Sequence, residues 1–330
     1  PYRARSSASV RPSASAPVRG PGHDDMLAIL LAAKHLDVVA ITTVHGNQSL
    51  AKVTSNTLKI VELGSLQHIP VSRGLAKPLL GEAVHAPEVH GESGLDGVDL
   101  PEASVETTEL DAVQTIIEMS HRYDDLVLVP TGPLTNIAAA LTVDPTLAER
   151  VTEISLMGGS LTFGNSTPAA EFNIWVDPEA ADIVFTSGIP IQMFGLNVTR
   201  QASATPERIQ SIREQGGAVA GTVADLLDFY QQSLFRVYGL EGASLHDPLA
   251  VATLIRPELF EMRPMHVGIE LNGTRTRGMT VCDYRHTGQA TTLNGQSAVR
   301  NGSAANARVA VGIDVDGFFA LLSETLGLYA

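Results

Sequence analysis

Three aspartates stand at the starts of segments that are typical of helices. Asp24 and Asp25 follow the Gly-Pro-Gly turn in "GPGHDDMLAILLA", and Asp247 precedes a proline and an apolar run in "LHDPLAVA". Ca²⁺ takes hard oxygen ligands such as carboxylates and backbone carbonyls. Asp25, Asp247 and a backbone carbonyl near Thr131 are therefore candidate calcium ligands. His246 lies beside one of them, and a histidine can donate a proton near neutral pH.

A second group of residues has the side-chain chemistry of a sugar site. Amide and carboxylate groups hydrogen-bond to the hydroxyls of a polyhydroxylated ligand. The candidates are Asn47, Asn165, Glu171 and Asn173. Together with a metal and a proton donor, they predict a metal-assisted hydrolase of a sugar-bearing small molecule. A simpler interpretation is that Asp24, Asp177 and Asp247 only cap helices, because Asp before Pro and an apolar run is a common helix start.

The elements that would position these residues alternate along the chain. Helices are predicted at 24–36, 49–64, 111–123, 134–142 and 177–188, and strands at 37–46, 69–74, 126–132, 153–159 and 189–198. This alternation indicates an α/β fold with a mainly parallel central sheet flanked by helices, similar to a Rossmann-like open sheet. Ligands bind beyond the carboxyl ends of such strands, where Asn47 and Thr131 occur. Residues 75–110 and 285–306 are predicted to be loops.

Composition narrows the class of partner. The chain has 330 residues and a formal net charge of −14, which does not fit a nucleic-acid polymer as ligand, because phosphate binding needs clustered Lys and Arg. No apolar run reaches the roughly 18 residues that a membrane helix needs. Cys282 is the only cysteine, which excludes an internal disulfide and a Cys-based zinc site and favours a reducing compartment such as the cytoplasm. A small molecule or a divalent metal is the expected partner.

The first twenty residues differ in composition from the rest. They are rich in Ser and Arg and contain no acid. Such a segment cannot bury enough apolar surface to offset its ordering entropy, and its prolines do not suit a central strand. We predict a disordered or altered segment at 1–20 and a single α/β domain at 21–330. An organelle transit peptide is an alternative for the segment.

From Gly22 to the C-terminus the chain resembles the inosine-uridine preferring nucleoside hydrolases. The resemblance is carried by "PGHDD", "ITTVHGNQSL", "HGESGLDG", "VPTGPLTNIA", "LMGG", "AEFNIWVDPEAA" and "HDPLAVA", in the order and approximate spacing of that family. It implies Ca²⁺-assisted hydrolysis of the N-glycosidic bond of ribonucleosides, in nucleoside catabolism and salvage. It also implies a homodimer or homotetramer in the cytoplasm, and leaves purine and pyrimidine substrates open.

The resemblance implies a role for individual residues. The metal would be held by Asp25, the carbonyl of Thr131 and Asp247. The ribose hydroxyls would be bound by Asp24, Asn47, Asn165, Glu171 and Asn173, with Met157 packed nearby. The base would be surrounded by His90, Phe172, Tyr230 and His246. His246 is the candidate acid for the leaving group and, with Asp24, a candidate catalytic residue.

The chain departs from the family pattern Asp-x-Asp-Pro-Gly-x-Asp-Asp at its start. Val18 and Gly20 occupy the positions of the first two acids, the second of which ligates the metal and acts as general base in the family. Loss of a general base lowers a rate by about 10²- to 10⁴-fold. We therefore predict a strongly impaired hydrolase. If the strand before Gly22 is also missing, an acid at position 20 alone would not restore the hydrolase activity.

Three other interpretations differ in their support. A non-catalytic nucleoside- or ribose-binding protein is the main alternative, because the ribose-binding residues are present while the general base is absent. A dinucleotide-binding dehydrogenase fits poorly, since the Gly-Pro-Gly turn lacks the third Gly of the fingerprint and two acids would repel a pyrophosphate. A zinc site of His45, His85 and His90 lacks helical ligand spacing.

Overall fold

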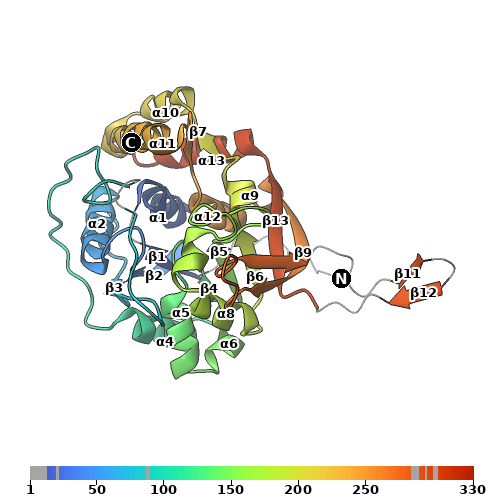
Figure 1. Ribbon diagram of the computed structural model, residues 1–330. Coiled ribbons are helices and arrows are strands. Elements are labelled where there is room, and N and C mark those ends of the chain that lie inside the picture. Colours follow the sequence, from blue (N-terminus) through green and yellow to red (C-terminus); the bar gives the residue numbers. More distant parts are fainter. Residues whose placement is uncertain (1–12, 20–21, 87–89, 284–289, 294–295, 300–303) are drawn as a thin grey trace, which may run out of the picture.

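A nine-stranded sheet forms the centre of the molecule, in the order β10-β9-β13-β6-β5-β4-β1-β2-β3 (Figure 1). The computed structural model describes residues 13–19, 22–86, 90–283, 290–293, 296–299 and 304–330. The strands of the sheet are β1 (Ser13–Arg19), β2 (Asp37–Val44), β3 (Val71–Arg73), β4 (Val127–Leu128), β5 (Glu153–Met157), β6 (Ile191–Phe194), β9 (Phe260–Ile269), β10 (Thr280–Asp283) and β13 (Ala307–Ile313). Neighbours from β13 to β3 are parallel, and β9 and β10 join antiparallel. The predicted α/β fold with a mainly parallel sheet is confirmed.

Helices cover both faces of this sheet. The helices are α1 (His23–His35), α2 (Leu50–Leu63), α4 (Ala112–Arg122), α5 (Thr135–Val143), α6 (Leu147–Arg150), α7 (Phe172–Val176), α8 (Pro178–Thr186), α9 (Leu196–Thr199), α10 (Pro206–Arg213), α11 (Gly217–Tyr238), α12 (Pro248–Ile255) and α13 (Val315–Gly327). Helices α1, α11, α12 and α13 pack together on one face, and α4, α5 and α8 lie on the other (Figure 1). The uninterrupted apolar run 26–32 explains why α1 is buried all round between the sheet and the outer helices.

The strand β1 corrects the prediction for the N-terminal segment. Ser13–Arg19 is not without order but pairs in parallel with β2 along its whole length, from Ser13 opposite Asp37 to Arg19 opposite Val44. On its other side β1 pairs with β4 only through Ala14 and Ser15. Pro17 therefore lies beyond the short β4 ladder, where its missing N–H removes less pairing than in a ladder continued on both sides. Residues 1–12 and Gly20 lie outside the described residues.

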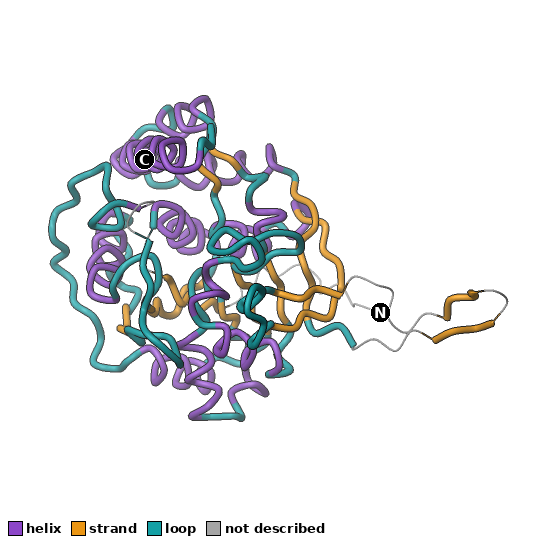
Figure 2. The backbone as a smooth tube through the Cα atoms, in the orientation of Figure 1, coloured by secondary structure: helices purple, strands orange, loops and turns teal. Residues whose placement is uncertain are grey.

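A second correction concerns the predicted loop 285–306. It contains the antiparallel pair β11 (Ala290–Leu293) and β12 (Gln296–Val299), which stands apart from the body of the molecule (Figure 2). The Asn-Gly dipeptide between these strands in the sequence is the strongest short-range hairpin signal. The segment was predicted to be a loop because most of its residues are polar, and the Asn-Gly signal was not taken into account.

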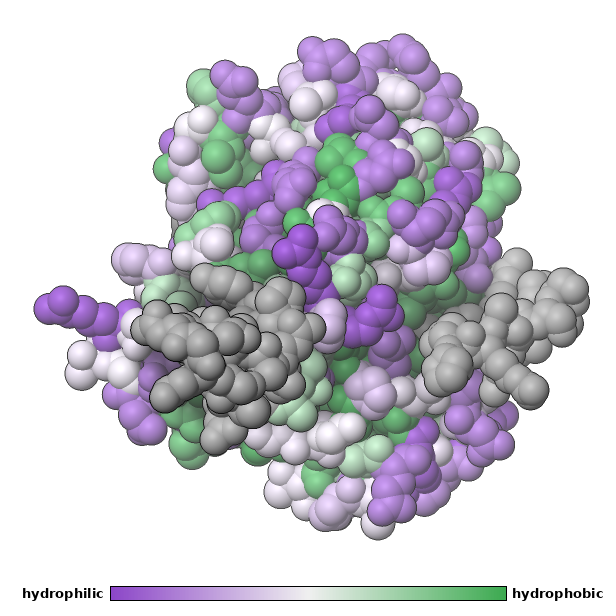
Figure 3. Space-filling model, turned by 90° about the vertical axis from the view of Figure 1, so that its right-hand side faces the viewer, coloured by the Kyte–Doolittle hydropathy of each residue, from purple (hydrophilic) through white to green (hydrophobic). Residues whose placement is uncertain are grey.

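The surface mixes residue types. On the face that is turned toward the viewer in Figure 3, hydrophilic residues are interspersed with hydrophobic ones. Among the helices that the structure describes, none combines the length and the apolar character that crossing a bilayer requires.

Candidate active site

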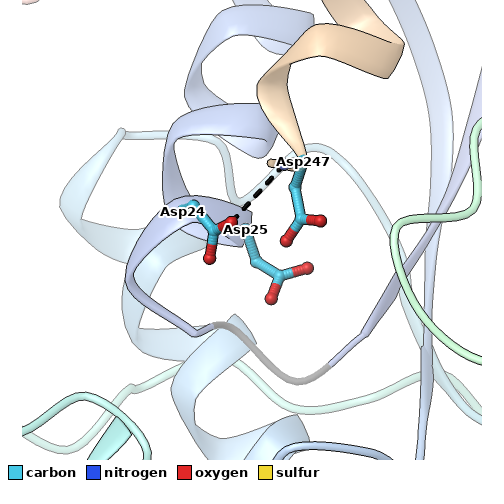
Figure 4. Close-up of side chains that lie close together, drawn as sticks. All are labelled: Asp24, Asp25 and Asp247. Atoms are coloured by element: carbon cyan, nitrogen blue, oxygen red, sulfur yellow. Dashed lines mark hydrogen bonds between the residues drawn. The ribbon is translucent and has the colours of Figure 1, made fainter. Parts of the chain in front are cut away.

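The acidic residues at the starts of α1 and α12 form one cluster (Figure 4). Asp24 and Asp25 lie in the first turn of α1, Asp247 directly precedes α12, and the two helices pack against each other. One oxygen from each of the three carboxylates lies within 4.8 Å of the others, and all three residues are buried. Helix N-termini favour negative charge, but buried carboxylates this close also repel one another. The arrangement offers hard oxygen ligands for a divalent cation.

Asp247 and Asp177 separate the two interpretations of an Asp-Pro helix start. Asp177 caps α8 in the ordinary way, since its side chain accepts a hydrogen bond from the N–H of Ala180. Asp247 stands before Pro248 in the same manner, yet among the described residues its side chain makes no capping hydrogen bond to α12. Its carboxylate joins the cluster instead. The helix-cap interpretation therefore accounts for Asp177 and is insufficient for Asp247.

Hydrogen bonds orient the other two carboxylates. Oδ2 of Asp24 accepts from the backbone N–H of His246 at 3.1 Å and of Asp247 at 3.4 Å. Oδ1 of Asp25 accepts from the hydroxyl of Thr131 at 2.8 Å, and its Oδ2 accepts from the N–H of Gly22 at 3.0 Å. Thr131 was predicted to take part through its carbonyl, which stays a prediction, while the structure shows that its hydroxyl holds Asp25.

The start of α7 meets the same edge of the sheet. The carboxylate of Glu171 accepts from the N–H of Gly159 and of Asn173, both at 2.9 Å. The side-chain amide of Asn173 donates to the carbonyl of Thr131 at 2.9 Å and of Met157 at 3.0 Å. Helix α7 is thereby tied to the residues that follow β4 and to the end of β5.

Asn173 also presents an acceptor. The side-chain nitrogen of Asn173 contacts two carbonyl oxygens and, at 3.3 Å, Sδ of Met157. Because the carbonyl oxygens only accept, the amide nitrogen must face them, which fixes the amide orientation of Asn173. Its Oδ1 is buried and has no hydrogen-bond partner among the described residues. A buried amide oxygen without a partner costs free energy. A hydroxyl, a water or a cation bound beside Asn173 would remove that cost.

The loop before α7 places two further candidates. Asn165 is exposed, and its Oδ1 accepts from the backbone N–H of Phe172 at 2.9 Å. The ring of Phe172 is nearly buried and lies 6.4 Å from that of Trp175, centroid to centroid. Asn165 is therefore exposed to solvent and held next to the start of α7.

Gly22 brings two more predicted residues to the start of α1. A Cβ atom at Gly22 would lie 2.8 Å from Cε1 of His90 and 3.0 Å from Nδ2 of Asn47. Both side chains are buried. Only glycine allows this close approach of the backbone, and it brings His90 and Asn47 beside Gly22, which precedes Asp24 by two residues.

The remaining predicted residues lie on two further elements. Tyr230 on α11 is buried and stacks on His90 at 5.3 Å. His246 is half-buried, and its Nδ1 lies 2.7 Å from the hydroxyl of Thr199. The contact with Thr199 orients the ring of His246, and its backbone N–H bonds to Asp24 of the acidic cluster.

The sequence analysis missed His23, Thr135 and the linkage around Asp177. His23 lies among the rings of His90 and Tyr230, and its place inside "PGHDD" was the only available signal. Thr135 donates to Asp177 at 2.6 Å and lies 3.0 Å from Nε2 of His45. Burial raises the pKa of Asp177, and the hydrogen bonds from Thr135 and the backbone partly oppose that shift. This network joins β2, α5 and α8.

The proposed zinc histidines point to different partners. His45 meets Thr135, His85 lies 3.0 Å from the carbonyl of Gly46, and His90 meets His23. In the described part of the chain, the one group of residues with metal-ligand geometry is the aspartate cluster. The structure therefore gives no support to a site of these three histidines.

Comparison with known proteins identifies the family. The model of the inosine-uridine preferring nucleoside hydrolases matches residues 20–320. The chain belongs to this family. Ribonucleoside hydrolysis at the N-glycosidic bond is the activity of nucleoside hydrolases, and the family resemblance seen in the motifs is confirmed.

Individual nucleoside hydrolases resemble the chain over almost its full length. A pyrimidine-specific ribonucleoside hydrolase, RihA of Shewanella baltica, is 46% identical over 94% of both chains, and the protein of that name from Citrobacter koseri is 44% identical over 94% of this chain and 96% of its own. Two solved structures superpose well. They are the plant nucleoside hydrolase PpNRh1 (TM-score 0.87, 31% identity, covering 96% and 99%) and the purine-preferring ribonucleoside hydrolase of Gardnerella vaginalis (TM-score 0.86, 33% identity, covering 96% and 98%).

Proposed function

We propose that this nucleoside hydrolase cleaves pyrimidine ribonucleosides to ribose and free base, with Ca²⁺ at the aspartate cluster. The observation that carries the proposal is the buried group of Asp24, Asp25 and Asp247 at the meeting point of two helix N-termini. The pyrimidine preference is supported by the curated relatives at 44 to 46% identity, which are described as pyrimidine-specific. The purine-preferring structural relative is less similar, at 33%.

The donor set fits a calcium ion. Asp25, Asp247 and the carbonyl of Thr131 would be its ligands. Oδ1 of Asn173, which has no partner among the described residues, would be a further hard oxygen. When bound, a divalent cation positions a water molecule and lowers its pKa. Within the protein, the hydroxyl of Thr131 and the N–H of Gly22 keep Asp25 oriented for that role.

The neighbouring residues would bind the ribose and the base. Asp24, Asn47, Asn165, Glu171 and Asn173, with Met157, are the proposed ribose contacts. Cleavage of the C–N bond builds positive charge on the sugar, so carboxylates and amides that hold its hydroxyls stabilise the transition state more than the ground state. His90, Phe172 and Tyr230 would border the base. His246 would donate a proton to the departing base, which becomes negative as the bond breaks.

The proposal includes impairment of the chain as it stands. The attacking water must lose a proton, and Val18 and Gly20 stand where the family pattern has its first two acids. Asp25 and Asp247 would remain as metal ligands. The chain would therefore still bind the metal and the nucleoside, while its rate of hydrolysis would be low. This observation favours the second candidate function, a nucleoside- or ribose-binding protein without catalysis. Uridine binding with no ribose release, even after an acid is restored at position 20, would support that candidate.

Substrate preference is the direct test of the proposed function. Uridine and cytidine are expected to give kcat/KM values at least about tenfold above those of inosine and adenosine, because a polar pocket built for one base leaves buried groups unpaired with another. Reducing-sugar release measures turnover. If the chain as it stands hydrolyses too slowly for that assay, calorimetry measures the Kd of each nucleoside. Equal or higher values for inosine would refute the pyrimidine assignment.

Calcium is also expected to stabilise the fold. At 100-fold excess over its Kd, a ligand that binds only the folded state adds about 2.7 kcal/mol to the free energy of unfolding, which corresponds to roughly 5 °C in Tm. The measurement compares the EDTA-treated chain with and without Ca²⁺, with Mg²⁺ as control for general ionic effects. An unchanged Tm with saturating Ca²⁺ would argue against the metal site.

The proposal retains three broader expectations for the family. Residues 21–330 form one α/β domain, the protein acts in the cytoplasm, and it assembles as a homodimer or homotetramer. Sedimentation of the purified chain measures the assembly.

A further inference from the structure

The segment that follows His90 runs beside α2 and is bonded to it by a row of side chains (Figure 1). Three consecutive backbone carbonyls of this segment each accept a hydrogen bond from a side chain, and the three donors are four positions apart in the chain. The pairs are Gly91 with Gln48 at 2.9 Å, Glu92 with Lys52, and Ser93 with Asn56 at 2.9 Å. Residues four apart share one face of a helix, so the spacing in the sequence produces the row.

Two of the three donors are buried amides. Gln48 and Asn56 are buried, whereas Lys52 is exposed. Gly94 packs against both amides, since a Cβ atom there would lie 3.0 Å from Cγ of Gln48 and 3.2 Å from Nδ2 of Asn56, and its φ is +90°. Glycine adopts this conformation without a steric cost. Gln48 and Asn56 are therefore both bonded to the segment and packed against it.

The segment is a turn that its own hydrogen bonds close. The carboxylate of Asp96 accepts from the backbone N–H of Glu92 at 3.0 Å and of Ser93 at 3.1 Å. The carbonyl oxygen of Asp96 lies 2.8 Å from Nε2 of His23, in the first turn of α1. Because the turn is closed in this way, fixing its carbonyls on α2 also fixes the residue directly before it, which is His90.

We propose that Gln48 and Asn56 are positioning residues that hold the turn after His90 and thereby keep the ring of His90 beside the start of α1. His90 lies against Gly22 and stacks on Tyr230 at 5.3 Å. This is the region proposed to border the base, so the consequence for the substrate rests on the proposed function. Without the two donors the turn is released, the ring of His90 leaves its place, and a nucleoside binds more weakly.

Two substitutions remove the donors and keep most of the volume. Gln48→Met and Asn56→Leu each replace a buried amide by an apolar side chain that has no N–H. Glu62→Leu is the matched control. Glu62 lies on the same helix, and its carboxylate accepts from the backbone N–H of Ser104 at 2.7 Å. Its substitution therefore releases the same stretch of chain at a point well past the turn.

Two measurements report the positioning without any substrate. Backbone hydrogen exchange, followed by mass spectrometry, is expected to become about three- to tenfold faster at residues 91–96 in Gln48→Met and Asn56→Leu, the effect of about one lost hydrogen bond, and to stay unchanged there in Glu62→Leu. The carbon-bound ring protons of His90, assigned by their loss in His90→Gln, have shifts that depend on the stacked ring of Tyr230. We expect these signals to move or broaden in both donor variants and to stay in place in Glu62→Leu.

Uridine binding tests the consequence for the substrate. Calorimetry is expected to give a Kd for uridine about three- to tenfold higher in Gln48→Met and Asn56→Leu than in the unsubstituted chain, and an unchanged Kd in Glu62→Leu. Circular dichroism verifies that each variant is folded.

The outcomes separate this inference from the proposed function. Unchanged exchange at residues 91–96 in the folded donor variants, or His90 signals that stay in place although the turn exchanges faster, would overturn the inference. If exchange and ring signals change as expected while the unsubstituted chain binds no pyrimidine nucleoside, the proposed function fails and the positioning role of Gln48 and Asn56 stands.

Discussion

Replacing Gly20 by Asp is expected to increase kcat for ribose release from uridine by about 10²- to 10⁴-fold, the usual contribution of a general base. Position 20 follows Arg19, the last residue of β1. Strand β1 runs parallel to β2 and β4, and residues of the candidate site follow both neighbours, Asn47 after β2 and Thr131 after β4. An acid directly after β1 therefore follows the corresponding end of a parallel strand. Reducing-sugar release at saturating Ca²⁺ measures the gain.

The control for this substitution is Gly20→Asn. Asparagine has the same size as aspartate and can bind a metal through its amide oxygen, but it cannot take a proton from water. If only Gly20→Asp increases kcat, the new side chain acts by taking a proton. If both variants increase kcat equally, the side chain acts as a metal ligand or through the local structure. If neither variant gains and the unsubstituted chain already turns over at an ordinary rate, another group accepts the proton. If none of the three chains releases ribose, the result favours the binding protein without catalysis. The sequence prediction that one substitution would not suffice assumed a missing strand, and β1 removes that reason.

Removing one carboxylate of the cluster is the second large effect. In the Gly20→Asp chain, Asp25→Asn and Asp247→Asn are each expected to weaken Ca²⁺ binding and to lower kcat/KM by at least about 100-fold. A metal that stabilises developing charge contributes several kcal/mol, and 1.36 kcal/mol corresponds to a factor of ten in rate. Calorimetric Ca²⁺ titration and the sugar-release assay measure the two effects separately.

Asp177→Asn is the matched control for these substitutions. Asp177 is also buried and also precedes a proline at a helix start, but it caps α8 and lies outside the cluster. Its substitution should leave Ca²⁺ affinity unchanged, because Asn caps a helix about as well as Asp. A comparable loss of Ca²⁺ binding in Asp177→Asn would attribute the effects at Asp25 and Asp247 to the fold rather than to ligation.

The sequence predicted the parts of the structure that depend on local patterns. The apolar run of α1 and the β-branched run of β2 are strong local signals for a buried helix and a buried strand. The rule that ligands bind at the carboxyl ends of parallel strands predicted that Asn47 and Thr131 lie near the start of α1. The approach of Asp25 to Asp247 needed only the assumption that both helices begin at that edge. The structure confirms this proximity, and the roles of the residues stay predictions.

The remainder depended on contacts between distant segments. The Ser, Ala and Pro residues of β1 have low strand propensity, and the ladder with β2 supplies the hydrogen bonds that composition could not indicate. His23 looked like a spacer between Gly22 and Asp24. Its contact with the carbonyl of Asp96 is set by how the loop after His90 folds back, which no periodic pattern in the sequence encodes.

The bond between Asp24 and the N–H of His246 has a consequence for how the protein is made. These residues are 222 positions apart in the chain, so the cluster of three carboxylates exists only after α12 has docked on α1. A nascent chain emerges N-terminus first. Asp24 and Asp25 are therefore synthesised long before Asp247, and the three carboxylates come together only when α12 packs against α1. Contacts at such sequence separation form late and slow folding. A divalent cation bound at this cluster, as proposed above, would then report that α12 has docked on α1.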